Sequence, residues 1–178
     1  FEWGEDPLAS QNHLMNALMG DDTDYFIKLQ KGTEYLENKT TETTTYLITM
    51  PYSGPLYAYF PKGTGGESPP ETPLSINNEY QLDLYINETD CTLYMGTYEK
   101  GEVVSITIEA DTEILKTSDN VFYVLNLPAF ANAVSQLRTH QIEISDWGAG
   151  YIKGRIDTGE YRTVFTGITY DKGWRVYV

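Results

Sequence analysis

The first periodic segment of the chain has the spacing of an amphipathic helix. Asp6 is a favourable N-cap, Pro7 suits the first helical position, and Gly20 can adopt the left-handed conformation that ends many helices. The segment therefore predicts a helix over residues 7–19. The larger apolar side chains follow an i, i+1, i+4, i+5 spacing, which predicts one buried stripe made of Leu14, Met15, Leu18 and Met19.

From Tyr25 onward the apolar positions alternate with a period of two, which indicates β-strands. Short runs rich in Val, Ile, Thr and Tyr are separated by Gly, Pro, Asn and Asp. They predict strands over residues 44–50, 56–60, 79–86, 92–98, 103–109, 121–125, 141–147, 151–157, 161–170 and 174–178. Within 103–109 the alternation predicts a buried face made of Val104, Ile106 and Ile108. Residues 99–101 end in Gly101 and predict a three-residue hairpin loop.

A second helix is predicted over residues 128–139. Pro128 can occupy its first turn, and Phe130, Val134 and Leu137 follow one another at i, i+4 and i+7. Several spacers between the predicted strands are too short for parallel crossovers, so they indicate antiparallel pairing. We therefore expect a mainly β fold, an antiparallel, jelly-roll-like β-sandwich with two short α-helices, formed by residues 1–178 as one domain.

One segment fits neither a helix nor a strand. Residues 61–73 contain three Gly and four Pro, which disfavour both a helix and a strand ladder. The pattern predicts an exposed, flexible loop. Loops of this length are functional in some domains and plain strand connections in others, and both interpretations remain open.

The charge balance excludes several kinds of partner. Twelve Lys plus Arg stand against 26 Asp plus Glu, which gives a formal net charge of −14. Because nucleic-acid binding and docking on anionic lipid both need clustered cations, we expect no nucleic acid as a partner and no electrostatic attraction to anionic lipid. The chain has one Cys, Cys91, and two His, so the sequence predicts no disulfide framework, no zinc site and no cofactor.

The motifs that usually carry catalysis are not found in the sequence. Gly148-Ala149-Gly150 lies between predicted strands, so it indicates a turn and not a nucleotide-binding loop. The acidic run at residues 21–24 follows the first helix without the spacing of a calcium loop, which favours a solvated turn. Neither His13 nor His140 lies beside a nucleophile elbow. We therefore predict no catalytic residue and no metal ligand.

Aromatic residues beside glycine-containing turns give a different signal. Exposed Trp and Tyr rings can stack on sugar rings, so we take Tyr170, Trp174 and Trp147 as the candidate carbohydrate-binding residues. Tyr170 and Trp174 flank the predicted turn at residues 171–173. Ordinary packing in half-buried strands is the alternative interpretation of the same side chains.

Four passages of the sequence, in order, resemble a known family. PLASQNHLMNALMG at residues 7–20, followed by YF at 25–26, is similar to the opening NPF-x-x-QN-x-L-x-x-x-L-x-G … YF of the extracytoplasmic region of YfhO-like bacterial membrane proteins. GPLYAY at 54–59 and LYMGTY at 93–98, with Gly101, resemble its GPLYLY strand and its LG-x-Y … G hairpin. TGITYDKGWRVYV at 166–178 resembles its ending S-I-P-Y-D-K-G-W-x-V-x-V-D-G, although Thr169 replaces the Pro.

The resemblance implies a role in decorating cell-wall polymers. The family consists of polytopic membrane proteins similar to GT-C glycosyltransferases, which act on polymers such as lipoteichoic acid in Gram-positive bacteria with an undecaprenyl-phosphate-linked sugar as donor. Because the chain starts without Met and stops inside an alternating pattern, we expect it to be part of a longer protein. The resemblance implies that this part lies on the extracytoplasmic face of the membrane. The catalytic acid of such enzymes lies in loops near the membrane-spanning helices, so we expect this part to be non-catalytic.

Three functions remain open at this point. The first is a scaffold or acceptor-binding module that contacts the transmembrane part of its parent and a cell-wall glycopolymer. A charge of −14 repels a polyphosphate chain, so scaffolding is slightly favoured over acceptor binding. The second is a free-standing carbohydrate-binding module, and the third is a secreted hydrolase, which only the number of carboxylates suggests.

Overall fold

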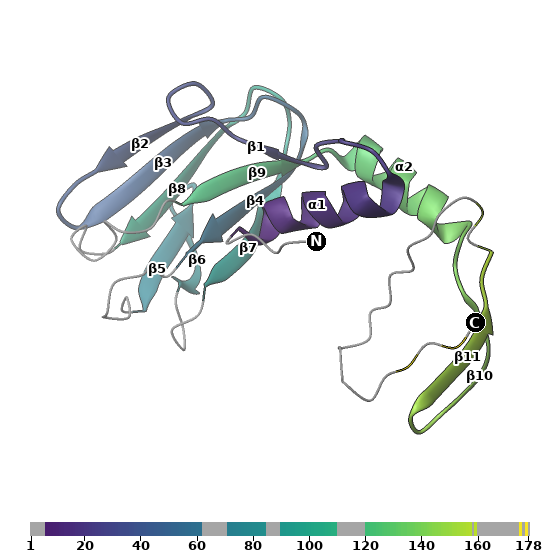
Figure 1. Ribbon diagram of the computed structural model, residues 1–178. Coiled ribbons are helices and arrows are strands. Elements are labelled where there is room, and N and C mark those ends of the chain that lie inside the picture. Colours follow the sequence, from purple (N-terminus) through teal and green to yellow (C-terminus); the bar gives the residue numbers. More distant parts are fainter. Residues whose placement is uncertain are drawn as a thin grey trace.

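The structure is a computed structural model that describes residues 6–61, 71–84, 90–109, 120–157, 159, 175 and 177. Two antiparallel sheets face each other, two helices lie at one end of them, and a separate hairpin follows the second helix (Figure 1). The predicted mainly β, antiparallel sandwich with two helices is confirmed in these residues. The predicted strands over 161–170 and 174–178 fall largely or wholly outside them, as do Tyr170 and Trp174.

Each sheet of the sandwich mixes early and late strands of the chain. The five-stranded sheet has the order β2 (Tyr35–Lys39), β3 (Thr43–Thr49), β8 (Val103–Glu109), β5 (Thr72–Ile76) and β6 (Glu79–Leu84). The four-stranded sheet has the order β1 (Phe26–Lys28), β9 (Val121–Leu125), β4 (Gly54–Phe60) and β7 (Cys91–Tyr98). The hairpin pairs β10 (Glu143–Gly148) with β11 (Tyr151–Arg155).

An aromatic cluster at the centre of the core joins the two sheets. The ring of Phe122, on β9, lies 5.1 Å from Tyr35, 5.0 Å from Tyr46 and 6.2 Å from Phe60, measured between centroids. Tyr35 and Tyr46 belong to the five-stranded sheet, whereas Phe60 and Phe122 belong to the four-stranded sheet. The ring planes of these three pairs, and of the pair Tyr35–Tyr46, are inclined to each other by 60° or more, which is the edge-to-face arrangement that aromatic rings favour in cores.

The alternation in β8 is confirmed, but the connection that precedes it is not a hairpin. Val104, Ile106 and Ile108 are fully buried, and Gly101 has the positive φ of +88° that its turn requires. However, β7 pairs with β4, and β8 pairs with β3 and β5. Residues 99–101 therefore lead the chain from one sheet to the other. The prediction was wrong because alternation shows which face of a strand is buried and not which strand lies beside it.

Both helices form at or within one residue of their predicted bounds. In α1 (Pro7–Met19), Oδ1 of Asp6 accepts hydrogen bonds from the backbone N–H groups of Leu8 and Ala9, and Gly20 ends the helix at φ +69°. The second helix, α2 (Leu127–Arg138), is capped by Asn126. The predicted stripe of α1 is only partly buried: Met15 is 7% exposed, whereas Leu14, Leu18 and Met19 are half-buried.

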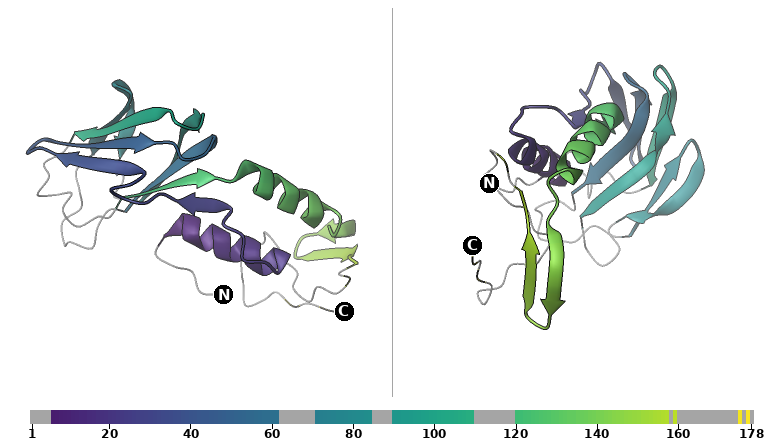
Figure 2. Two further views of the ribbon diagram at one scale, coloured as in Figure 1. Left: turned by 90° about the horizontal axis from the view of Figure 1, so that it is seen from above. Right: turned by 90° about the vertical axis from the view of Figure 1, so that its right-hand side faces the viewer.

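The helices pack on each other at the end of the four-stranded sheet. Met15 of α1, Tyr25 and Ala133 of α2 form a small buried cluster, with Tyr25 and Phe130 edge to face. The side chain of Asn12 ties α1 to β1, since it donates to the carbonyl of Phe26 and accepts from its N–H. α1 thus contacts both α2 and the edge strand β1, and its predicted stripe is divided between these contacts and solvent (Figure 2).

The long Pro- and Gly-rich segment is shorter than expected. Strand β5 begins at Thr72, which is fully buried, and Pro73 pairs with Asp83 of β6. Residues 62–70 of the predicted loop lie outside the described residues. Strands β1, β2 and β5 were not specified by the sequence patterns, because β1 has three residues and β5 contains a proline.

A partly buried glutamate on β2 binds two lysines and a tyrosine of β3 beside the aromatic cluster. Glu37 on β2 forms ion pairs with Lys31 and with Lys39, the latter at 3.0 Å, and it accepts a hydrogen bond from the Tyr46 hydroxyl at 3.2 Å. The Tyr46 hydroxyl in turn accepts from Asn120 at 2.7 Å. Burial alone would raise the pKa of Glu37, but the hydrogen bonds from Lys31 and Lys39 outweigh it and lower the pKa below its usual range.

Glu37→Gln is expected to destabilise the protein by about 1–2 kcal/mol at pH 7, because it leaves two cations without their charged acceptor. A carboxylate with a depressed pKa stabilises the fold above its unfolded pKa, about 4.3 for Glu, and this contribution is lost as the pH falls through the folded value. Urea unfolding at pH 7 and pH 3 measures the difference between variant and parent protein, which should shrink at pH 3. A difference that stays constant with pH, or an equal effect of Glu79→Gln at an exposed site, would contradict this explanation.

Candidate functional site

The hairpin carries the one candidate carbohydrate-binding residue that the structure describes. Trp147 lies on β10, is 73% exposed, and pairs with Ile152 of β11. Tyr151 follows the turn, and its hydroxyl donates to Oδ2 of Asp146 at 3.0 Å. The positions of Tyr170 and Trp174 lie outside the described residues, so the structure leaves untested whether the three aromatic residues meet.

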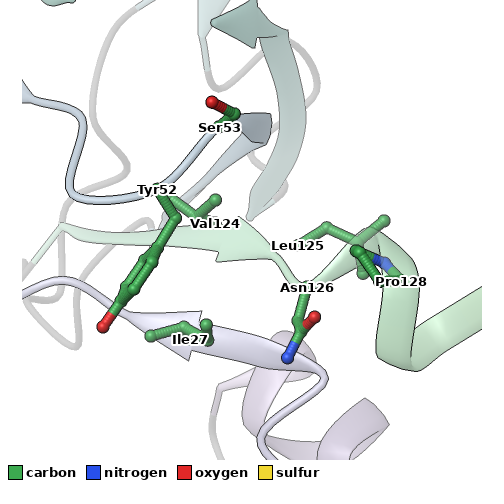
Figure 3. Close-up of a pocket in the computed structure, with 7 residues that line it drawn as sticks. All are labelled: Ile27, Tyr52, Ser53, Val124, Leu125, Asn126 and Pro128. Carbon is green, nitrogen blue, oxygen red and sulfur yellow. The ribbon is translucent and has the colours of Figure 1, made fainter. Parts of the chain in front are cut away.

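A groove opens where β1, β9, α2 and the loop between β3 and β4 converge (Figure 3). Its volume is about 320 Å³, near the lower end of the range for small-molecule sites. The residues that line it are Ile27, Tyr52, Ser53, Val124, Leu125, Asn126 and Pro128. We call it the Tyr52 groove, because the half-exposed ring of Tyr52 is its largest side chain.

Polar groups of the Tyr52 groove are held by their neighbours. Oγ of Ser53 donates to Oε2 of Glu99 at 2.7 Å and accepts from the N–H of Lys100 at 2.9 Å. Oδ1 of Asn126 accepts from the N–H of Ala129 as the cap of α2, and the Asn126 side chain, whose Nδ2 group can donate, is among those that line the groove (Figure 3). The lining thus combines an aromatic ring, aliphatic groups and neutral hydrogen-bonding groups.

This lining fits an uncharged ring with hydroxyl groups better than it fits an anion. Among the described residues, no charged side chain lines the groove, and Glu99, which binds Ser53 of the lining, opposes a phosphate. Sequence reasoning missed Tyr52 and Asn126. Both residues lie between the predicted elements, Tyr52 between the strands 44–50 and 56–60 and Asn126 between the strand 121–125 and the helix 128–139, where no periodic pattern singles them out.

A second exposed aromatic surface lies on the outer face of the four-stranded sheet. Tyr94 of β7 is 59% exposed and its ring centroid lies 5.7 Å from that of Tyr57 on β4. Phe26 of β1 packs edge to face against Tyr57 on the other side. The Tyr94 hydroxyl lies 2.9 Å from Oγ1 of Thr97. The planes of neighbouring rings in this row are inclined by 79° between Phe26 and Tyr57 and by 54° between Tyr57 and Tyr94.

The acidic run after α1 is a hydrogen-bonded turn. The carboxylate of Asp21 accepts from the N–H and the hydroxyl of Thr23 and from the hydroxyl of Tyr25 at 2.9 Å. Burial raises the pKa of Asp21, but these hydrogen bonds outweigh it, so the pKa lies below its usual value. Among the described residues, no three His, Cys, Asp or Glu side chains are grouped closely enough to hold a metal ion.

A polar cavity of about 300 Å³ lies at the base of the hairpin. Its lining comprises Thr139, Gln141, Glu143, Arg155 and Asp157. Glu143 and Arg155 are cross-strand neighbours, and the ring of His140 lies 3.2 Å from the carbonyl of Asp157. Acidic and basic side chains therefore line the cavity together, which favours a structural role at the junction of α2 and the hairpin.

Comparisons with known proteins identify the family. No curated protein matches the sequence. A solved structure, the native family 35 carbohydrate-binding module from Clostridium thermocellum, is similar over 56% of this chain and 87% of its own, with 13% identity and a TM-score of 0.31, too low to support a functional argument. No helix in the described part of the chain is long and apolar enough to cross a membrane. The family model for the bacterial membrane protein YfhO matches residues 2–178, so the chain belongs to the YfhO family of bacterial membrane proteins.

Proposed function

We propose that this chain is the extracytoplasmic, non-catalytic part of a membrane protein that glycosylates a cell-wall polymer such as lipoteichoic acid. In this role it holds the acceptor polymer beside the transmembrane part of its parent. The observation that carries the proposal is membership of the YfhO family along the whole sequence. The Tyr52 groove supports the acceptor-binding form of the proposal over a purely scaffolding one.

The charge of the chain restricts how an acceptor can bind. A phosphate-rich polymer is repelled by a net charge of −14, and salt screens this repulsion only beyond about 8 Å. The Tyr52 groove avoids the conflict because its lining, in the part of the chain that the structure describes, contains no charged side chain. The sugar substituents of the polymer would occupy the groove, with a ring face on Tyr52 and hydroxyl groups near Asn126, while the phosphates stay in solvent.

Tyr52→Ala is expected to weaken binding of a glycosylated glycerol-phosphate oligomer by about tenfold, since a stacked aromatic contact contributes roughly 1 kcal/mol or more. Calorimetric titration of the purified chain measures the affinity. Tyr94→Ala is the matched control, because it also removes an exposed tyrosine from the sandwich but lies on β7, outside the groove. Unchanged affinity in Tyr52→Ala would show that the Tyr52 groove does not bind the oligomer.

A free-standing carbohydrate-binding module is the second candidate function. The row formed by Tyr94, Tyr57 and Phe26 favours it, because the exposed ring of Tyr94 can stack on a sugar ring of a neutral polysaccharide. The same pair of variants separates the two functions. Binding of an unphosphorylated polysaccharide that is lost in Tyr94→Ala and kept in Tyr52→Ala would support the module and contradict the proposed acceptor site.

A further inference from the structure

The hairpin has one entirely apolar face. Cross-strand pairing places Trp147 beside Ile152 and Ile144 beside Gly154 on the same side of the ribbon. Ile142 covers Gly154, since a Cβ atom there would lie 2.8 Å from Cγ1 of Ile142. The apolar face therefore comprises Ile142, Ile144, Trp147 and Ile152, which are 44–73% exposed.

The opposite face carries acidic and basic side chains whose charges cancel. Glu143 pairs with Arg155 and Asp146 with Lys153, so two acids stand across from two bases. The net charge of this face is zero, whereas that of the chain is −14. The apolar and the charged side chains therefore lie on separate faces of the hairpin. A hairpin with solvent on both sides does not require such a separation.

Nothing in the described part of the chain covers the apolar face. All residues of β10 and β11 are exposed, and the hairpin stands apart from both sheets beyond the end of α2 (Figures 1 and 2). A two-stranded ribbon has no interior of its own and is marginally stable in water. A contiguous apolar face of this kind usually marks a contact surface.

We propose that the apolar face of the hairpin rests on the lipid–water interface of the membrane. Membership of a membrane-protein family places a bilayer next to this chain, and a ribbon face is flat enough to lie on it. Trp147, on the apolar face near the tip of the hairpin, is a residue type that favours the interfacial region. A second copy of the chain is a poorer fit, because four side chains offer far less area than the roughly 800 Å² per partner that stable complexes bury.

The contact is apolar and not electrostatic. Because the charges of the hairpin cancel, it is not repelled by lipid headgroups, while the acidic sandwich is repelled by anionic lipid. We expect weak binding to vesicles of zwitterionic phosphatidylcholine and weaker binding to vesicles that contain anionic lipid, with the difference reduced by salt. In the parent protein the attachment to the membrane raises the effective concentration, so a weak contact is sufficient. This inference rests on family membership and is independent of the proposed acceptor.

The test uses the purified chain with 5-fluorotryptophan in place of its three tryptophans, and Trp147→Phe assigns the signal of residue 147. Vesicles of phosphatidylcholine should shift that signal and make it accessible to quenching by brominated acyl chains. Ile152→Asn, on the apolar face, should lower vesicle binding by about tenfold, the effect of one buried aliphatic side chain. Lys153→Asn, the next residue on the charged face, should leave it unchanged.

Three results would overturn the inference. The first is equal vesicle binding by Ile152→Asn and Lys153→Asn, with the urea midpoint of the sandwich unchanged in both. The second is protection of Trp147 from a water-borne quencher without lipid present, if the protection persists when the protein is diluted. That result would show that another part of this chain covers the apolar face. The third is protection that disappears on dilution, which would show that a second copy of the chain covers the apolar face.

Discussion

Phe122→Ala is expected to lower the free energy of unfolding by about 3–5 kcal/mol, the typical cost of removing a fully buried phenylalanine. Phe122 is completely buried, and its ring is the part of the aromatic cluster that touches both sheets. Its removal leaves a cavity between Tyr35, Tyr46 and Phe60, whose rings are held on different strands and can close the gap only partly.

The urea midpoint at neutral pH measures this loss. Val103→Ala is the control, because Val103 lies on a strand of the same sandwich but is 61% exposed, so it should change stability by less than about 0.5 kcal/mol. A loss below 1 kcal/mol for Phe122→Ala would show that the two sheets are not joined through this ring.

Gly96→Ala is expected to cost about 1–3 kcal/mol, because the substitution combines backbone strain with a steric conflict. Gly96 has a φ of +116°, and a Cβ atom there would lie 2.8 Å from the hydroxyl oxygen of Tyr98. That hydroxyl is not free to move away, since it donates to the carbonyl of Met95 at 2.7 Å. The pairing of β4 with β7 shifts register beside Gly96, so this is a bulge closed by the Tyr98 ring.

Thermal unfolding of Gly96→Ala and Gly101→Ala separates the two causes. Gly101 also has positive φ, but nothing lies within 4 Å of its Cβ position, so its substitution adds strain without a conflict. We expect a clearly larger fall in melting temperature for Gly96→Ala than for Gly101→Ala. Equal falls would mean that the Tyr98 ring does not fill the space above Gly96. Gly96 and Tyr98 belong to a passage that resembles the family, and the bulge gives a structural reason for their spacing of two residues.

The elements that depend on local sequence could be predicted, and those that depend on distant partners could not. Helix α1 was predicted from Asp6 and Gly20, whose capping roles involve only neighbouring residues. Strand β8 was predicted from its alternation. The connection at residues 99–101 was misassigned, because whether β7 pairs with β8 depends on β4, β3 and β5, which compete for the same edges.

The candidate site shows the same division. The exposure of Trp147 follows from its place beside a glycine turn, and its selection as a candidate was a local inference. The Tyr52 groove brings together Ile27, Tyr52 and Asn126, which are separated by up to about a hundred residues, so no pattern along the chain indicates it. The amphipathic character of the hairpin became clear only once its register was known, because the irregularity between Ile144 and Asp146 changes which residues share a face.

Titration of the isotope-labelled chain with glycerol-phosphate oligomers, with and without sugar substituents and with and without Ca²⁺, tests the central claim most directly. The account predicts saturable shifts of backbone amides that line the Tyr52 groove, such as Tyr52, Ser53 and Asn126, with the glycosylated oligomer alone and without need of Ca²⁺. No shifts up to millimolar ligand, or shifts that require Ca²⁺ and do not depend on the sugar, would contradict it.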